Sequence, residues 1–77
     1  MAAEVRMPKL GLSEADMTLA SWEKNPGDSV KTGETIAVVE GEKLTSNLEA
    51  ECDGILGEHL VQEGEEVKIN TLLTTIN

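Results

Sequence analysis

Lys43 is the residue of this chain whose surroundings most favour a covalent modification. Glu42 precedes it directly and Glu40 stands three residues before it. Nearby carboxylates favour the charged ammonium, so this lysine should lack the neutral amine that a nucleophilic or general-base lysine needs. An amine on an acidic turn can instead be the substrate of an enzyme that joins it to a carboxylate as an amide. Spacing alone is more typical of a solubilising surface lysine.

Cys52 and His59 are the other pair with chemical potential, and the pattern around them does not support catalysis. The sequence supplies neither an oxyanion-hole motif nor a third residue to orient the histidine. One cysteine and one histidine exclude a disulfide framework and a Cys- or His-rich metal site. A chain of 77 residues buries only about 60–65% of its unfolded surface, which leaves little room for a deep pocket. We therefore predict a non-enzyme with no catalytic residue and no metal.

An internal repeat predicts how the chain presents Lys43. The segment Gly27–Lys31 returns as Gly64–Lys68, an offset of 37 residues. Other positions stay in phase with this offset: Leu19 with Leu56, Trp22 with His59, and Val39 with Ile76. The repeat predicts a duplicated β unit, with halves at about 3–40 and 41–77 and the lysine near their join.

Short apolar runs separated by Gly, Pro, Asn and Asp predict an all-β fold of roughly eight strands. The run Ile36–Val39 is apolar throughout, which predicts a strand covered on both sides. The stretch after the lysine alternates, so Leu44, Ser46, Leu48, Ala50 and Cys52 should share the packed face. These two strands should form a hairpin with the loop Glu40–Lys43.

The formal charge of −9 is distributed without a basic stripe, which argues against nucleic acid and anionic membrane as partners. No apolar run approaches the ~20 residues of a membrane span, and the first residues do not resemble an export signal. We expect one monomeric domain, residues 1–77, excised from a longer chain. Its compartment should be the cytoplasm, or the mitochondrial matrix in a eukaryote.

The chain resembles a lipoyl domain of the biotinyl/lipoyl-carrier family from about Val5 to Ile76. The similarity lies in Met7–Leu12, Trp22–Val30 and Gly33–Glu40, followed by Glu42-Lys43 at the usual place of an acidic residue and a modified lysine. This resemblance implies a flattened β-barrel, or barrel-sandwich hybrid, of two four-stranded sheets related by a pseudo-two-fold axis. It also implies that the termini lie close together, with Lys43 at the far end.

The family's modifying enzymes depend on a glutamate three positions before the lysine and on glycines sixteen before and eleven after it. Glu40, Gly27 and Gly54 stand at those positions, and Glu42 completes the acidic pair. The resemblance implies lipoate in amide linkage to Lys43, attached by a lipoate ligase or lipoyl-transfer enzymes.

The implied role is a swinging arm in a 2-oxo acid dehydrogenase complex. Its partners would be a thiamine-dependent 2-oxo acid decarboxylase, the dihydrolipoamide acyltransferase core and dihydrolipoamide dehydrogenase. Aspartate is commoner than Glu42 before the modified lysine, so the particular complex stays open.

Two alternatives remain within this fold. A biotin carrier presents its lysine between two methionines, whereas Glu42 and Leu44 flank Lys43 here. An unmodified structural sandwich domain would need no modified lysine at all, and the matching residues around Lys43 would then be coincidence.

Overall fold

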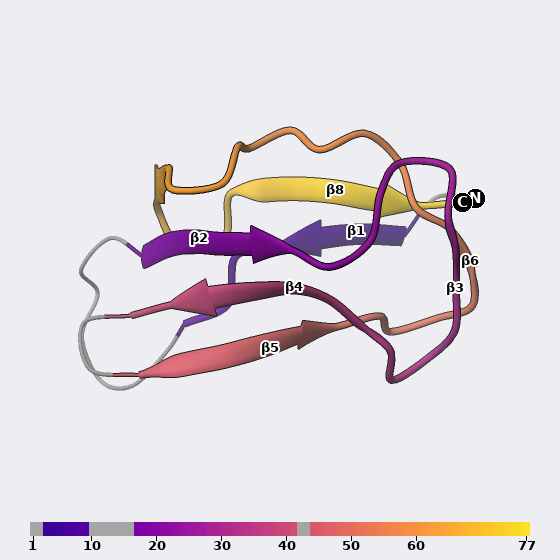
Figure 1. The fold of residues 1–77 in the computed structure, drawn as a ribbon, viewed down its shortest axis with the longest axis horizontal. Coiled ribbons are helices and arrows are strands. Elements are labelled where there is room, and N and C mark those ends of the chain that lie inside the picture. The colour runs from indigo at the N-terminus through magenta and orange to yellow at the C-terminus, as the bar shows by residue number, and fades with distance from the viewer. Residues whose placement is uncertain (1–2, 10–16, 42–43) are drawn as a thin grey trace.

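The chain folds into eight short β-strands in the part that the computed structural model describes, residues 3–9, 17–41 and 44–77 (Figure 1). These described residues contain no helix, which confirms the predicted all-β class. The molecule is elongated, with extents of 31 × 20 × 19 Å. The strands are β1 (Ala3–Arg6), β2 (Met17–Trp22), β3 (Ser29–Val30), β4 (Thr35–Glu40), β5 (Thr45–Glu49), β6 (Gly54–Ile55), β7 (Glu66–Val67) and β8 (Leu72–Ile76).

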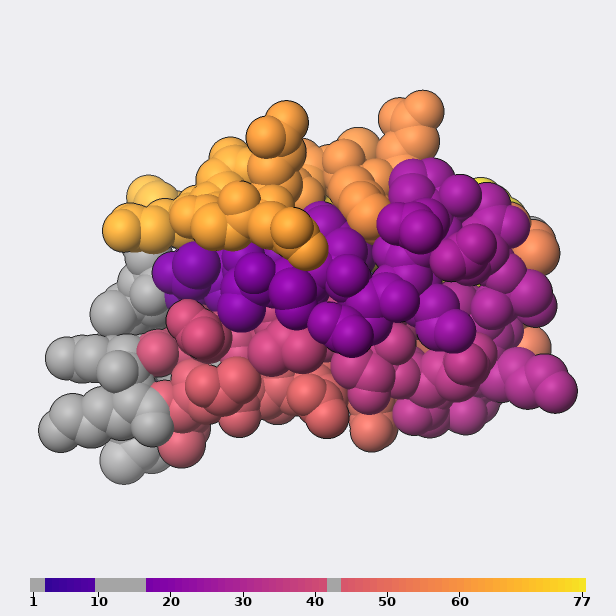
Figure 2. Space-filling view, in the orientation of Figure 1, coloured from indigo at the N-terminus to yellow at the C-terminus, as the bar shows by residue number. Residues whose placement is uncertain are grey.

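The strands form two antiparallel layers. One layer is a continuous sheet in the order β5-β4-β2-β7, and the segments of β2, β4 and β5 lie side by side on the face shown in Figure 2. The other layer consists of the pairs β1-β8 and β3-β6. A bridge between Leu56 and Ile76 joins these pairs, and Gly57 N–H donates to the Thr75 carbonyl at 2.7 Å. The second layer therefore has the order β1-β8-β6-β3, which confirms two four-stranded sheets.

A pseudo-two-fold axis relates the two layers. The pairing of Leu19 with Val39 in the first layer recurs in the second as Leu56 with Ile76, 37 residues later in both strands. The first strand of each half pairs with the last strand of the other half, since β1 pairs with β8 and β5 with β4. The two halves are thus intertwined, and neither forms a layer by itself.

Trp22 and His59 mark the position of this axis. Their rings stack with centroids 3.9 Å apart and planes 2° from parallel. Trp22 Nε1–H donates to the Val61 carbonyl at 2.9 Å, and His59 Nε2 lies 2.9 Å from the Lys24 carbonyl. A carbonyl oxygen only accepts, so the hydrogen of this second bond belongs to Nε2. Val61 lies two residues after His59, and Lys24 lies two residues after Trp22. The two bonds are therefore equivalent under the repeat, and the axis passes through the stack.

Two β-bulges explain why neighbouring residues of β4 and of β8 are both buried. The β4–β5 register shifts between Thr35 and Ala37, which leaves Ile36 as an extra residue. The β1–β8 register shifts in the same way around Leu73, the counterpart of Ile36. A bulge lets neighbouring side chains enter the core, because the extra residue breaks the strict alternation. Ile36 and Ala37 are both fully buried, as are Leu73 and Thr74, whereas Val38 and Thr75 are only half-buried. The covering predicted on both sides of the β4 strand is therefore wrong, because the bulge turns neighbouring side chains into the same core.

The core divides into two clusters of aliphatic side chains, as expected for a chain with no Phe or Tyr. The first cluster contains Met7, Met17, Leu19, Ala37, Val39, Val61, Val67 and Leu73. The second contains Val5, Val30, Ile36, Ala50, Leu56 and Ile76. Leu48 packs against both clusters and so joins them at one side of the molecule.

Two details of the predicted hairpin are wrong. Glu40 belongs to β4 and pairs with Thr45, so the connection comprises residues 41–44 and is shifted by one residue from the predicted Glu40–Lys43. Leu44 is 52% exposed, although the alternation placed it on the packed face with Leu48. It lies before β5 begins, at the end of the hairpin, where the ladder that fixes the direction of alternate side chains has stopped.

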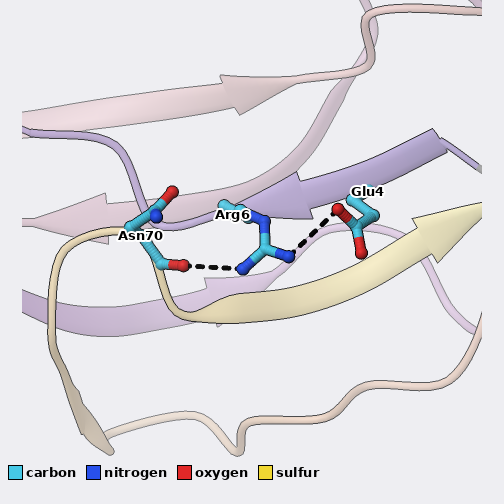
Figure 3. A network of polar contacts seen from close by, with 3 residues as sticks. All are labelled: Glu4, Arg6 and Asn70. Atoms are coloured by element: carbon cyan, nitrogen blue, oxygen red, sulfur yellow. Dashed lines mark hydrogen bonds and ion pairs between the residues drawn. The ribbon is translucent and has the colours of Figure 1, made fainter.

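The turn before β8 contains a backbone conformation that usually requires glycine. Asn70 has φ +73°, and its counterpart in the first half, Gly33, has φ +89°. Asparagine tolerates this left-handed region better than most residues. The turn is attached to β1, because Arg6 Nη1–H donates to the Asn70 carbonyl at 2.9 Å (Figure 3). Asn70 N–H in turn donates to the Met7 carbonyl at 2.8 Å.

Candidate functional site

The predicted modification turn joins the end of β4 to the start of β5, which lie at one end of the long axis (Figure 1). Glu40 pairs with Thr45, and Gly41 N–H donates to the Leu44 carbonyl at 2.7 Å. Only two residues connect Gly41 to Leu44. They are Glu42 and Lys43, and both lie outside the described residues. Glu40 and Leu44, which stand on either side of this connection, are exposed to solvent.

The strand that leads into this turn has a rigid base. Ile36, Ala37 and Val39 of β4 have no measurable exposure. β4 also pairs on both edges, with β2 and with β5. Close packing and two ladders restrain the strand, so its last residue, Glu40, is held at a fixed place relative to the core.

The two glycines predicted to help modification lie away from the turn. Gly54 belongs to β6 and pairs with Val30 of β3, and Gly27 lies in the loop before β3. Figure 1 places β3 and β6 at the end where β8 finishes, opposite the end where β4 finishes. Of the predicted site residues that the structure describes, only Glu40 is next to the turn.

Each of these glycines has a structural reason to be glycine. Gly27 has φ +91°, a conformation that is costly for residues with a side chain, and its N–H donates to the Leu56 carbonyl at 2.8 Å. A Cβ at Gly54 would stand 2.5 Å from the Asn77 carbonyl oxygen and 2.7 Å from Ile76 Cγ2. Gly54 therefore allows β6 to approach the end of β8.

Polar contacts hold together the loops around β3. Thr32 donates to Asp53 Oδ1 through its backbone N–H at 2.7 Å and its hydroxyl at 3.0 Å. These bonds, the backbone one first, lower the pKa of the Asp53 carboxyl. The Lys31 N–H and then the Lys24 ammonium, 3.1 Å from Oε2, lower the pKa of Glu34.

The contacts of Cys52 and His59 belong to the packing of the fold. His59 is held in the stack with Trp22 by its bond to the Lys24 carbonyl. Cys52 is half-buried and packs against the second core cluster. Within residues 3–9, 17–41 and 44–77, no three His, Cys, Asp or Glu side chains gather as a metal site would require. The same residues include no helix long and apolar enough to cross a membrane.

Sequence reasoning missed the Trp22–His59 stack. The signal was present, because the repeat aligns these two residues. A repeat cannot by itself show that its axis passes between a given aligned pair, so the contact needed the three-dimensional arrangement.

The sequence profile of the Biotin_lipoyl family, described as "Biotin-requiring enzyme", matches residues 3–76. The dihydrolipoyllysine-residue succinyltransferase component of the 2-oxoglutarate dehydrogenase complex from Pseudomonas aeruginosa is 42% identical over 77 residues, which are 100% of this chain and 19% of that protein. The dihydrolipoyllysine-residue acetyltransferase component of the acetoin cleaving system from Bacillus subtilis is 41% identical and aligns with 99% of this chain and 19% of its own length. The chain thus spans about a fifth of the length of these relatives.

A solved structure has the same fold. The lipoyl domain of the 2-oxoglutarate dehydrogenase complex from Azotobacter vinelandii superposes with a TM-score of 0.83 and 35% sequence identity. The match covers 97% of this chain and 95% of that domain, so it extends to both layers and the hairpin strands.

Proposed function

Because this chain belongs to the biotinyl/lipoyl-carrier family and is a non-catalytic domain of the lipoyl type, we propose that it carries lipoate in amide linkage to Lys43. The observation that carries the proposal is the two-residue connection between Gly41 and Leu44. Lys43 is one of these two residues, and the buried strand β4 leads into them. A modifying enzyme could therefore reach the amine from outside the fold.

The residues around the turn fit a long attached group. Glu40 and Leu44 are both exposed, so the described flanks leave the end of the hairpin open. Lipoate supplies a dithiolane that carries acyl groups and electrons. The chain itself supplies the fixed position, the acidic flank and an open approach, and tethering raises the local concentration of the carried group to as much as about millimolar.

We assign the recognition residues two separate roles. Glu40 and Glu42 would contact the lipoate ligase or lipoyl-transfer enzyme, since they stand beside Lys43. Gly27 and Gly54 lie at the other end of the domain, so they would act indirectly, by allowing the fold that holds the hairpin.

We further propose that the domain is part of a longer protein in a 2-oxo acid dehydrogenase-type complex. The named relatives are components of a 2-oxoglutarate dehydrogenase complex and of an acetoin cleaving system. The domain would visit a thiamine-dependent decarboxylase, an acyltransferase core and dihydrolipoamide dehydrogenase. A cytoplasmic or mitochondrial-matrix location fits such a complex. The identity of the acyl group depends on those partners.

The direct test is enzymatic attachment followed by intact and peptide mass measurement. The domain is incubated with lipoate, ATP and a lipoate ligase, beside the variants Lys43→Ala and Lys68→Ala. We expect a single lipoyl addition on the Lys43 peptide, its loss in Lys43→Ala, and its retention in Lys68→Ala, which removes an exposed lysine elsewhere.

A parallel incubation with biotin and a biotin ligase separates the two carrier types. Biotin on Lys43, without lipoate, would reassign the domain as a biotin carrier. No addition of either group to the folded domain would leave the structural sandwich as the better account.

A further inference from the structure

A shallow groove lies between strands β1 and β5, away from the proposed modification turn. The apolar side chains of Ala3, Val5, Leu48 and Ile76 line it, and it encloses about 60 Å³. Val5 is the most exposed member of the buried core, at 9%. The groove is therefore a place where the core reaches the surface, and it has room for one slender side chain.

The groove lies between two open strand edges. Among the described strands, β1 pairs only with β8 and β5 only with β4, so each is the edge of its layer. Residues of both strands line the same groove. An open edge presents backbone N–H and carbonyl groups that an extended segment of another chain can use.

Carboxylates dominate the rim. Glu4, Glu49 and Glu51 line the groove together with Arg6. Arg6 Nη2 lies 3.0 Å from Glu4 Oε1, and Arg6 Nη1–H donates to the Asn70 carbonyl (Figure 3). Three carboxylates and one guanidinium leave two negative charges. Within the part of the chain that the structure describes, neither Glu49 nor Glu51 has an ion-pair partner.

We propose that this groove binds an extended basic segment of a partner protein. The aliphatic stem of one lysine or arginine of that segment lies on Val5, Leu48 and Ile76, and its charged head meets Glu49 and Glu51. Long cationic side chains combine an apolar stem with a charged tip in this way. Arg6 already shows that a guanidinium fits beside a rim carboxylate. The proposal does not depend on modification of Lys43.

The test uses the unmodified, ¹⁵N-labelled domain and a blocked seven-residue peptide of alternating threonine and lysine. NMR titration should give saturable amide shifts centred on β1 and β5. The double variant Glu49→Gln/Glu51→Gln should weaken binding by about 2- to 30-fold, the range for losing two exposed ion pairs. The matched control Glu58→Gln/Glu66→Gln removes the same charge from exposed residues outside the groove, and it should change the affinity by less than about twofold.

Three results would overturn the proposal. Shifts spread over the whole surface, or equal weakening by both double variants, would mean attraction to the net charge of the domain alone. Equal binding of a peptide in which acetyl-lysine replaces lysine would mean that the groove takes an uncharged segment. No saturable shifts at millimolar peptide would mean that it has no such ligand.

Discussion

Replacing Gly54 by alanine should destabilise the domain without touching the modification turn. The added Cβ would lie 2.5 Å from the Asn77 carbonyl oxygen and 3.1 Å from the Asn77 carbonyl carbon. Both are backbone atoms, so no side-chain rotation relieves the clash. The contact between β6 and the end of β8 must open instead. Overpacking of this kind costs about 1–3 kcal/mol of unfolding free energy.

The unfolding entropy, which scales with chain length, gives the change in melting temperature that corresponds to this free energy. An unfolding entropy of about 2.1 cal/mol/K per residue gives about 160 cal/mol/K for 77 residues. One kcal/mol then corresponds to about 6 °C, so Gly54→Ala should melt about 6–18 °C lower. Calorimetry or circular dichroism measures the shift. Gly27→Ala is the comparison, because nothing lies within 4 Å of its Cβ, and only the strain of φ > 0, about 1–2 kcal/mol, applies there.

Lipoate attachment separates the structural role of Gly54 from a recognition role. At a temperature where Gly54→Ala remains folded, the rate of attachment should equal that of the parent domain, because Gly54 lies at the opposite end from the hairpin turn. A variant with an unchanged melting temperature and a lost attachment reaction would refute this reasoning, and the glycine would then be a contact of the modifying enzyme.

Three further changes test other parts of the fold by thermal or chemical unfolding. Asn70→Gly should be neutral or stabilising while Asn70→Val costs about 1–2 kcal/mol, since φ is +73° there; equal stability of the two variants would contradict the strain. Thr74→Val should stabilise by about 1 kcal/mol, because the buried hydroxyl has no hydrogen-bond partner among the described residues; a loss of stability would mean that the hydroxyl is bonded. The pKa values of Glu34 and Asp53 are lowered by the backbone N–H groups of Lys31 and Thr32, so their stabilisation is present above the ordinary carboxyl pKa and lost as pH falls through the lowered values. Glu34→Gln with Asp53→Asn should therefore flatten the acid side of the stability profile, and an unchanged slope would exclude both groups as its cause.

The sequence predicted the layers of the fold because their causes are local or periodic. Gly27 and Gly64 mark equivalent turns, whereas the uninterrupted apolar run of β4 was wrongly interpreted as burial on both sides. The bulge at Ile36 was not predicted, since it depends on how the two layers pack. Leu44 was misplaced for a related reason: alternation applies only within a paired strand, and pairing begins at Thr45.

The sequence predicted which residues stand at fixed offsets from Lys43, but not which of them lie near it in the fold. Glu40 lies beside the hairpin turn as its spacing to Lys43 requires. The separation between Gly54 and that turn could not be read from their spacing, because the strand β5 lies between them and an extended chain advances by about 3.3–3.6 Å per residue. A glycine at a fixed offset can therefore belong to the fold and not to the site.

The intertwined halves determine how the domain must fold. Among the described strands, the edge strand β1 pairs with β8 alone, and β5 completes a layer begun by the other half. No contiguous fragment of half the chain contains a complete sheet, so little native structure should persist in either half alone. The second layer closes only when the first and last strands meet, and the first layer also combines strands of both halves. The search for the native state is therefore long-range, and its loss should be all-or-none.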